Sequence, residues 1–233
     1  MDLSLMDSPA AEAATAMVVA PVRRAPRQSR SRRLVEMALT ACAELITERG
    51  LAALSTNAVA ERAGVSVGAI YQYFPDKAAL VAALRARHLQ AMLKAVAARW
   101  DAVAPANLAE AVQALVAGQF EAHAIAPVLH AELLALGPFF VVADARLSGD
   151  EAQAPGLLWL RWRRLLAAHR DQLALGGTER GLDLDLAAWV ALHTVNGLAQ
   201  GAALPFARQA LQAAAEQAVW AYLKGAAPLS GCP

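Results

Sequence analysis

The sequence predicts an all-α protein built from two domains. Alanine and leucine, both strong helix formers, account for most of a hydrophobic fraction of 58%. Apolar residues recur at helical spacing along most of the chain, and no stretch of any length alternates as a strand would. Breaks rich in Gly, Pro and Asp divide this pattern into segments of helical length.

Charge is unevenly distributed, although the net charge is only +1. Residues 1–99 contain 13 Lys/Arg against 8 Asp/Glu, a net +5, whereas residues 100–233 contain 8 against 12, a net −4. The segment 23–99 alone contains 13 against 5, a net +8. A basic amino-terminal part joined to an acidic carboxy-terminal part indicates two roles in one polypeptide.

Neither a membrane span nor a secretory signal is predicted, despite a mean hydropathy of +0.36. The most apolar stretch, residues 182–204, contains polar side chains that would be costly inside a bilayer: Asp183, Asp185, His193, Asn196 and Gln200. Acidic residues occupy the start of the chain, where a signal peptide would be basic. We therefore expect a cytoplasmic protein.

The two cysteines predict neither a disulfide framework nor a zinc site, because Cys42 and Cys232 have no closely spaced partner. Cys42 falls on an apolar helical stripe and is expected in a core. No nucleophile–base pair or metal-ligand constellation is recognisable either. The sequence thus predicts no cofactor, no metal and no enzymatic activity.

Residues 1–29 lack periodicity and end in the Pro/Arg-rich stretch PVRRAPRQSR, which is typical of a flexible basic arm. Two interpretations of this arm remain open. It could solubilise the chain, or it could reach phosphates or a minor groove through Arg23, Arg24, Arg27 and Arg30.

Four helices are expected between Arg32 and Trp100. The first carries an apolar stripe and ends at Gly50. A short second helix is capped by Ser55 and broken by Gly64, and a third, residues 67–73, is capped by Ser66. Pro75 ends the third helix and Asp76 caps the fourth. Five further helices are expected at about 107–123, 127–136, 154–174, 183–203 and 206–223.

The segment VAERAGVSVGAIYQYFPDKAAL, residues 59–80, has the form of a helix-turn-helix. Gly64 allows the left-handed conformation that a tight turn needs. Small residues at 67–69 let the following helix approach base edges, and Ser66 at its positive end can donate to a phosphate. This pattern predicts a recognition helix that lies in the major groove of duplex DNA.

The segment AERAGVSVGAIYQYF followed by PDK-x-x-L resembles the DNA-binding domain of the TetR (tetracycline-repressor) family over about residues 30–84. The resemblance implies an all-α homodimer with three DNA-binding helices, and a domain at 85–225 that holds an inducer pocket and the dimer interface, before a tail at 226–233. It implies phosphate contacts by Ser55, Ser66, Tyr71, Tyr73 and Lys77, and base-facing positions at Val67, Gly68, Ala69 and Gln72.

Two departures from the family pattern affect DNA recognition. Ser55 stands where Thr is usual, which is chemically equivalent. Val67 stands where a long polar or basic residue is frequent, and this leaves Gln72 as the main candidate for polar base readout, with DNA shape supplying further specificity. The rings of Tyr71 and Tyr73 could also pack in the domain's core. Ile70 and Phe74 are expected to be core residues only.

The carboxy-terminal domain is less informative. The family pattern implies that the last two helices pair with their symmetry mates, although a core within one chain is an equal alternative for each residue. Ligand-pocket candidates, each of which could instead be a core residue, are Phe120, His123, His130, Trp159, Trp162, His193 and Asn196. A metal site at His123, His130 and Glu132 is not favoured, because Pro127 interrupts the helix between the histidines.

The leading hypothesis is a dimeric repressor that binds a pseudo-palindromic operator and is released by an apolar or aromatic small molecule. An activator, or a regulator that needs no ligand, would have the same sequence features. A less favoured alternative is a small-molecule-binding or enzymatic helical protein with a vestigial DNA-binding domain.

Overall fold

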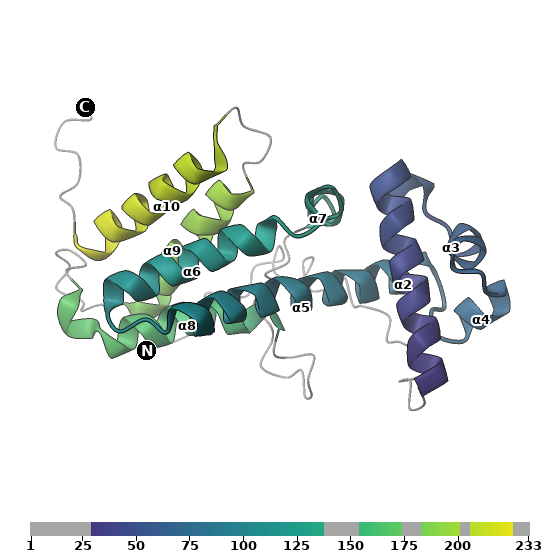
Figure 1. The fold of residues 1–233 in the computed structure, drawn as a ribbon, viewed down its shortest axis with the longest axis horizontal. Helices are drawn as coiled ribbons and strands as arrows, with labels where there is room; N and C mark the ends of the chain where they lie inside the picture. The colour runs from purple at the N-terminus through teal and green to yellow at the C-terminus, as the bar shows by residue number, and fades with distance from the viewer. Residues whose placement is uncertain (1–28, 138–153, 174–182, 201–205, 226–233) are drawn as a thin grey trace, which may run out of the picture. The chain divides into compact units, whose positions relative to one another are not determined.

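The computed structural model describes residues 29–137, 154–173, 183–200 and 206–225, and every regular element within these ranges is helical (Figure 1). The predicted all-α fold is thus confirmed. The described residues divide into two compact units, one that ends at Ala86 and one that begins at Arg87. The helices of eight residues or more are α2 (Ser29–Arg49), α3 (Thr56–Ala63), α5 (Lys77–Val103), α6 (Leu108–His123), α7 (Pro127–Leu134), α8 (Ala154–Ala168), α9 (Leu184–Ala199) and α10 (Arg208–Leu223).

The first unit also contains the short helix α4 (Val67–Tyr71) and the 3-10 turn η2 (Leu51–Ala53). Helix α3 packs on both α2 and α4. The core of this unit is formed by α2, α3 and α4, the segment that follows α4, and the start of α5. It includes Leu39, Cys42, Ile46, Val59, Ile70, Phe74 and Leu80. The expected core positions of Cys42, Ile70 and Phe74 are confirmed, since each is fully buried. Cys232 lies outside the described residues.

Helix boundaries in the first unit follow local signals. Gly50, at φ 75°, ends α2, and its N–H donates to the carbonyl of Ile46 at 2.8 Å. Asp76 caps α5 by accepting from the N–H of Ala79 at 2.8 Å. Helix α2 begins at Ser29, three residues before the predicted start, so Arg30 belongs to this helix rather than to the arm. The remaining arm arginines, Arg23, Arg24 and Arg27, lie outside the described residues.

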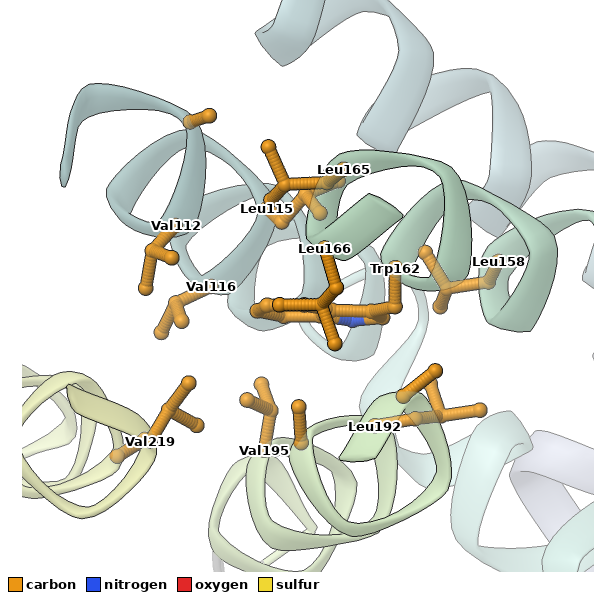
Figure 2. Close-up of a cluster of buried hydrophobic side chains, with 14 of the residues drawn as sticks. Val112, Leu115, Val116, Leu158, Trp162, Leu165, Leu166, Leu192, Val195 and Val219 are labelled. Carbon is orange, nitrogen blue, oxygen red and sulfur yellow. The ribbon is translucent and has the colours of Figure 1, made fainter. Parts of the chain in front are cut away.

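The second unit is built around Trp162 of α8, whose side chain is fully buried (Figure 2). The indole ring lies between Leu115 of α6 and Val195 of α9. Helix α9 packs against α8, α10 and α6. Half of its buried positions are alanines (Ala187, Ala188 and Ala191), which lets its neighbours approach closely.

Helices α5 and α6 also approach closely, at Gly118. A Cβ atom at this position would lie 3.1 Å from the Cα of Val96 and 3.3 Å from the Cβ of Arg99. Glycine is therefore the residue that fits this crossing without a shift of the α5 backbone.

Side-chain caps explain where two helices of the second unit begin. Asn107 accepts from the N–H of Glu110 at 2.9 Å, and Glu110 accepts in return from the N–H of Ala106, one residue before the cap, at 2.9 Å. Asp183 accepts from the N–H groups of Asp185 and Leu186 at 3.0 Å each.

Helix α8 ends earlier than predicted, at Ala168, and is followed by the 3-10 turn η4 (Arg170–Gln172). Among the helices that the model describes, none is long and apolar enough to cross a membrane.

Candidate nucleic-acid interface and ligand cavity

The turn between α3 and α4 is made by Gly64 at φ 65° and ψ 33°, the left-handed conformation predicted from the sequence. Its N–H donates to the carbonyls of Ala60 and Glu61, and the N–H of Val65 returns to Ala60 at 3.0 Å. These bonds close the last turn of α3 and redirect the chain at once into α4. The two helices therefore form a helix-turn-helix.

Both helices of this motif begin at a capping serine. The Oγ atom of Ser55 accepts from the N–H of Ala58 at 3.1 Å, and that of Ser66 accepts from Ala69 at 3.2 Å. A hydroxyl that caps a helix uses a lone pair and keeps its hydrogen. Each serine is exposed and can thus still donate a hydrogen bond to an anion beside the positive end of its helix.

The exposed face of α4 contains few side-chain atoms. Gly68 and Gln72 are exposed, whereas Val67 and Ala69 are half-buried. A Cβ atom added to Gly68 would meet nothing within 4 Å, so this part of the helix surface is open. Gln72 is thus the long polar side chain among the four predicted base-facing positions.

The remaining predicted phosphate contacts lie in different environments. The hydroxyl of Tyr71, which is 44% exposed, lies 3.2 Å from the Oγ1 of Thr56 at the start of α3. Tyr73 is only 8% exposed, which is the core position that the alternative interpretation expected. The Nζ of Lys77 donates to the carbonyl of Leu51 at 2.8 Å, a bond that uses one of its three hydrogens.

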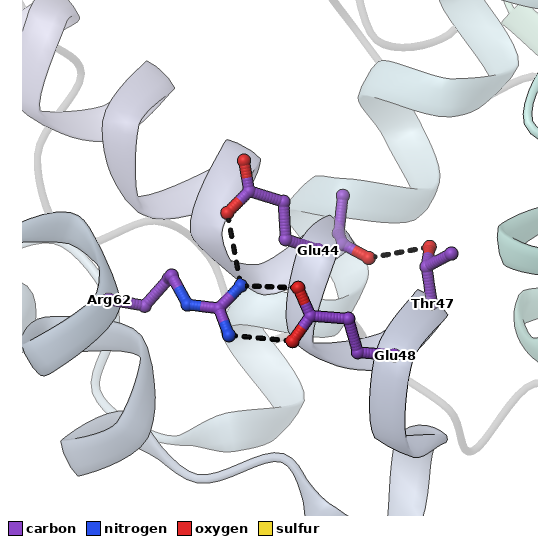
Figure 3. Close-up of polar contacts among 5 residues, drawn as sticks. Glu44, Thr47, Glu48 and Arg62 are labelled. Atoms are coloured by element: carbon purple, nitrogen blue, oxygen red, sulfur yellow. Dashed lines mark hydrogen bonds and ion pairs between the residues drawn. The ribbon is translucent and has the colours of Figure 1, made fainter.

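Arg62 holds the helix-turn-helix onto α2 (Figure 3). Its two terminal nitrogens donate to the carboxylate oxygens of Glu48 at 2.8 and 2.7 Å, and Nη1 also reaches Glu44 at 3.2 Å. The guanidinium lowers the pKa of Glu48 through these hydrogen bonds, and the two carboxylates raise the pKa of Arg62. The positive charge of Arg62 is therefore neutralised within the unit.

A small cavity lies inside the second unit, where α5, α6, α8 and α9 meet. Its volume is about 10 Å³, and its lining is mostly apolar, from residues such as Met92 and Leu158. Three polar side chains also line it: Gln119, His123 and Asn196. All three are buried, with exposed fractions of 1%, 7% and 4%.

Three buried histidines form a hydrogen-bonded chain that ends at this cavity. The Nε2 of His88 lies 3.0 Å from the Nδ1 of His130, and the Nε2 of His130 lies 3.0 Å from the Nδ1 of His123. The Nε2 of His123 lies 3.3 Å from the Oδ1 of Asn196. Burial lowers the pKa of all three histidines, that of His130 to about 4, so the chain is neutral at pH 7.

The contact between His123 and His130 corrects one expectation from the sequence. The break at Pro127 was expected to keep the two histidines apart. Instead Ala126, at φ 46°, turns α7 back on α6, and the two rings meet edge to face with centroids 4.7 Å apart. Among the residues that the model describes, no group of three His, Cys, Asp or Glu side chains is arranged to hold a metal ion.

The other predicted pocket residues are dispersed. Phe120 and Trp162 are buried in the hydrophobic core, and Trp159 packs partly buried against it. His193 is exposed and stacks on Trp189, with ring centroids 3.9 Å apart. Two further residues belong to this region, His88 in the histidine chain and Gln119 in the cavity lining. The sequence did not single them out, because no motif or spacing distinguishes them from core residues.

The fold and the helix-turn-helix define a DNA-binding regulatory protein of the helical, two-unit type. Residues 38–84 match the family model for bacterial regulatory proteins of the tetR family. Over these residues the chain is therefore similar to the DNA-binding domain of that family, the resemblance that its sequence suggested.

Solved structures support the same fold. A TetR-family transcriptional regulator from Streptomyces coelicolor is 24% identical, with a TM-score of 0.55 over 82% of this chain and 97% of that one. A protein of unknown function from Rhodococcus sp. RHA1 is 22% identical, with a TM-score of 0.63 over 82% and 95%. The fatty acid degradation regulator FadR from Bacillus halodurans is 17% identical, with a TM-score of 0.58 over 87% and 98%. No curated protein matches the chain.

Proposed function

We propose that this protein is a repressor that binds a pseudo-palindromic operator as a homodimer and is released by a small apolar ligand. The observation that carries the proposal is the helix-turn-helix, in which Gly64 turns the chain, α4 presents Gly68 to solvent, and Gln72 is exposed where α4 ends. A dimer would place two such helices in successive major grooves, about one helical turn apart.

The contacts to DNA follow from the exposed groups of the motif. Ser55 and Ser66 donate to phosphates at the amino-terminal ends of α3 and α4. Tyr71 and Lys77 hold phosphates on the side of the groove beside them, and Tyr73 adds its hydroxyl while its ring stays in the core. Gln72 reads a base edge, and Val67, Gly68 and Ala69 permit close approach.

The dimer uses the outer faces of α9 and α10. Leu186 is 55% exposed and Trp189 is 39% exposed, and they lie on one face of α9 with His193 and Gly197. On α10 small residues are exposed at helical spacing: Ala210, Ala213, Ala214, Ala218 and Ala221. A large apolar stripe beside a stripe of alanines favours close packing against the same two helices of a second copy.

The ligand binds in the second unit and shifts the equilibrium between two dimer conformations. The cavity beside Met92 supports a ligand site in this unit. A ligand that binds better to the conformation with mis-spaced recognition helices releases the operator.

The test is a footprint with full-length protein on the intergenic DNA beside its own gene, followed by fluorescence anisotropy on the protected duplex. We expect a protected, two-fold symmetric sequence and binding that weakens steeply with salt. Failure to retain any duplex at low salt would contradict the proposal and favour a vestigial DNA-binding domain. Protection accompanied by increased transcription would favour an activator instead.

A further inference from the structure

Two side chains that line the cavity each have one buried polar atom without a hydrogen-bond partner. These atoms are the Oε1 of Gln119 and the Nδ2 of Asn196, and neither has a hydrogen-bond partner among the described residues. The other ends of both side chains are occupied, because Gln119 donates to the carbonyl of Leu115 at 3.1 Å and Asn196 accepts from His123. Leaving such atoms unpaired is costly, so each calls for an explanation.

The orientation of Asn196, with Oδ1 toward His123 and Nδ2 unpaired, determines the tautomers of the histidine chain. The Oδ1 of Asn196 can only accept, so the Nε2 of His123 must donate to it, which makes the Nδ1 of His123 an acceptor. His130 then donates from Nε2, and His88 donates from Nε2 to His130. One neutral tautomer at all three histidines satisfies the chain and holds the amino group of Asn196 as the leftover donor.

The lining of the cavity therefore includes one side chain with an unpaired donor and one with an unpaired acceptor, in neutral and mostly apolar surroundings. None of its nine lining side chains carries a formal charge at pH 7. Arg208 acts on His123 from outside this lining, and its own guanidinium donates to the carbonyl of Phe120. No cation is thus placed in the lining to receive a carboxylate.

We propose that Gln119 and Asn196 bind the hydroxyl group of a neutral, otherwise apolar ligand. The oxygen of an alcohol accepts from the amino group of Asn196 while its hydrogen is donated to Gln119. A carboxylate or an ether could not donate to Gln119 and would leave its carbonyl buried and unpaired. This inference rests on the proposed effector role and names the chemistry of that site.

The size of the cavity agrees with this assignment. A volume of about 10 Å³ holds roughly one oxygen-sized group. The hydrocarbon part of the ligand must displace side chains, and the flexible Met92 and Leu93 line the cavity on its α5 side. The histidine chain also begins on α5, at His88, and the first ten residues of this helix belong to the first unit.

The test uses three probes with the same ten-carbon chain, 1-decanol, decanoate and methyl decyl ether, titrated into the full-length protein by calorimetry. We expect 1-decanol to bind roughly tenfold or more tightly than either of the others. Gln119→Met and Asn196→Leu should remove that preference. Gln113→Met, the same change at an exposed position of α6, should keep it.

Circular dichroism and thermal unfolding of each variant would separate lost binding from lost structure. Equal or tighter binding of decanoate, no binding of 1-decanol, or an unchanged preference in folded Gln119→Met would overturn the hydroxyl site. Anisotropy on operator DNA tests the effector role separately. Binding of 1-decanol with the expected preference but no release from DNA would leave the site in place and contradict the proposed effector function.

Discussion

The Nε2 of His130 lies 3.0 Å from the Nδ1 of His123, across a break in the helical pattern that separates them by seven residues. Because His130 uses its other ring nitrogen toward His88, each nitrogen of its ring has a histidine neighbour. A proton added to His130 would turn its accepting nitrogen into a donor that faces another donor. The contact therefore makes the fold of the second unit sensitive to acid.

We predict that the protein loses stability as the pH falls from 7 toward 5. The folded pKa of His130 is about 4, below the ordinary value of about 6.5, so the unfolded chain binds the proton more tightly. The contribution of neutral His130 to the free energy of unfolding is therefore fully present above pH 6.5 and is lost as the pH falls toward 4. His88 and His123 shift in the same direction, through burial and the charges of Arg87 and Arg208.

Urea unfolding at pH 7 and pH 5 measures this effect. His130 alone should contribute about 1–2 kcal/mol to the difference, allowing for partial solvent screening. His130→Gln can donate and accept without titrating, and it should reduce the pH dependence. His169→Gln, at a half-buried histidine outside both the histidine chain and the proposed dimer face, serves as the control. Equal pH dependence in all three proteins would contradict the prediction.

A second prediction concerns Arg62, whose guanidinium makes a two-bond contact with Glu48. Arg62→Lys cannot reproduce the planar pair of bonds and should lower the Tm, by more at low salt than in 1 M NaCl. The lowered pKa of Glu48 means that the pair stabilises above about pH 4.5 and weakens as Glu48 is protonated below it. A Tm difference independent of salt would show that the ion pair is not the cause.

Gly68→Ala should have opposite effects on stability and on operator affinity. The added methyl group meets nothing within 4 Å, and alanine favours helix over glycine by about 1 kcal/mol, so the variant should be at least as stable as the wild type. If α4 lies in the major groove with Gly68 against the bases, operator affinity should fall by about tenfold, or about 1.4 kcal/mol. Anisotropy and thermal unfolding on the same preparation measure both. Unchanged affinity would show that Gly68 does not approach the DNA.

Substitutions at two neighbouring residues, Tyr71 and Gln72, should affect DNA binding in different ways. Tyr71→Phe removes a hydroxyl beside Thr56 and should weaken binding about equally across sequences, because phosphate contacts carry no base information. Gln72→Ala should relax the preference at particular base pairs. Selection from a random duplex pool with both variants compares them. An unchanged sequence preference for Gln72→Ala would exclude its readout role.

The local structure of the first unit could be predicted from the sequence because its signals are local. Gly64, Ser66 and Asp76 each act within four residues, through a backbone conformation or a cap. The cavity could not be predicted, because His88 and His130 lie 42 residues apart, and His123 and Asn196 lie 73 apart. Periodicity places such residues on an inward face but does not say which side chain meets which. The unpaired atom of Gln119 is likewise a property of packing alone.

The last prediction tests the proposed dimer at Trp189, which is 39% exposed and stacked on His193. If this face of α9 packs against a second copy, Trp189→Glu would bury a carboxylate in an apolar interface and should produce a monomer. Phe206→Glu, at a position 61% exposed, is the control for adding a charge at an exposed aromatic residue. Light scattering coupled to size exclusion gives the mass directly. A dimer that persists in Trp189→Glu with undiminished self-association would place the interface elsewhere. A folded monomer should also bind the operator more weakly, because each half-site would then be bound alone.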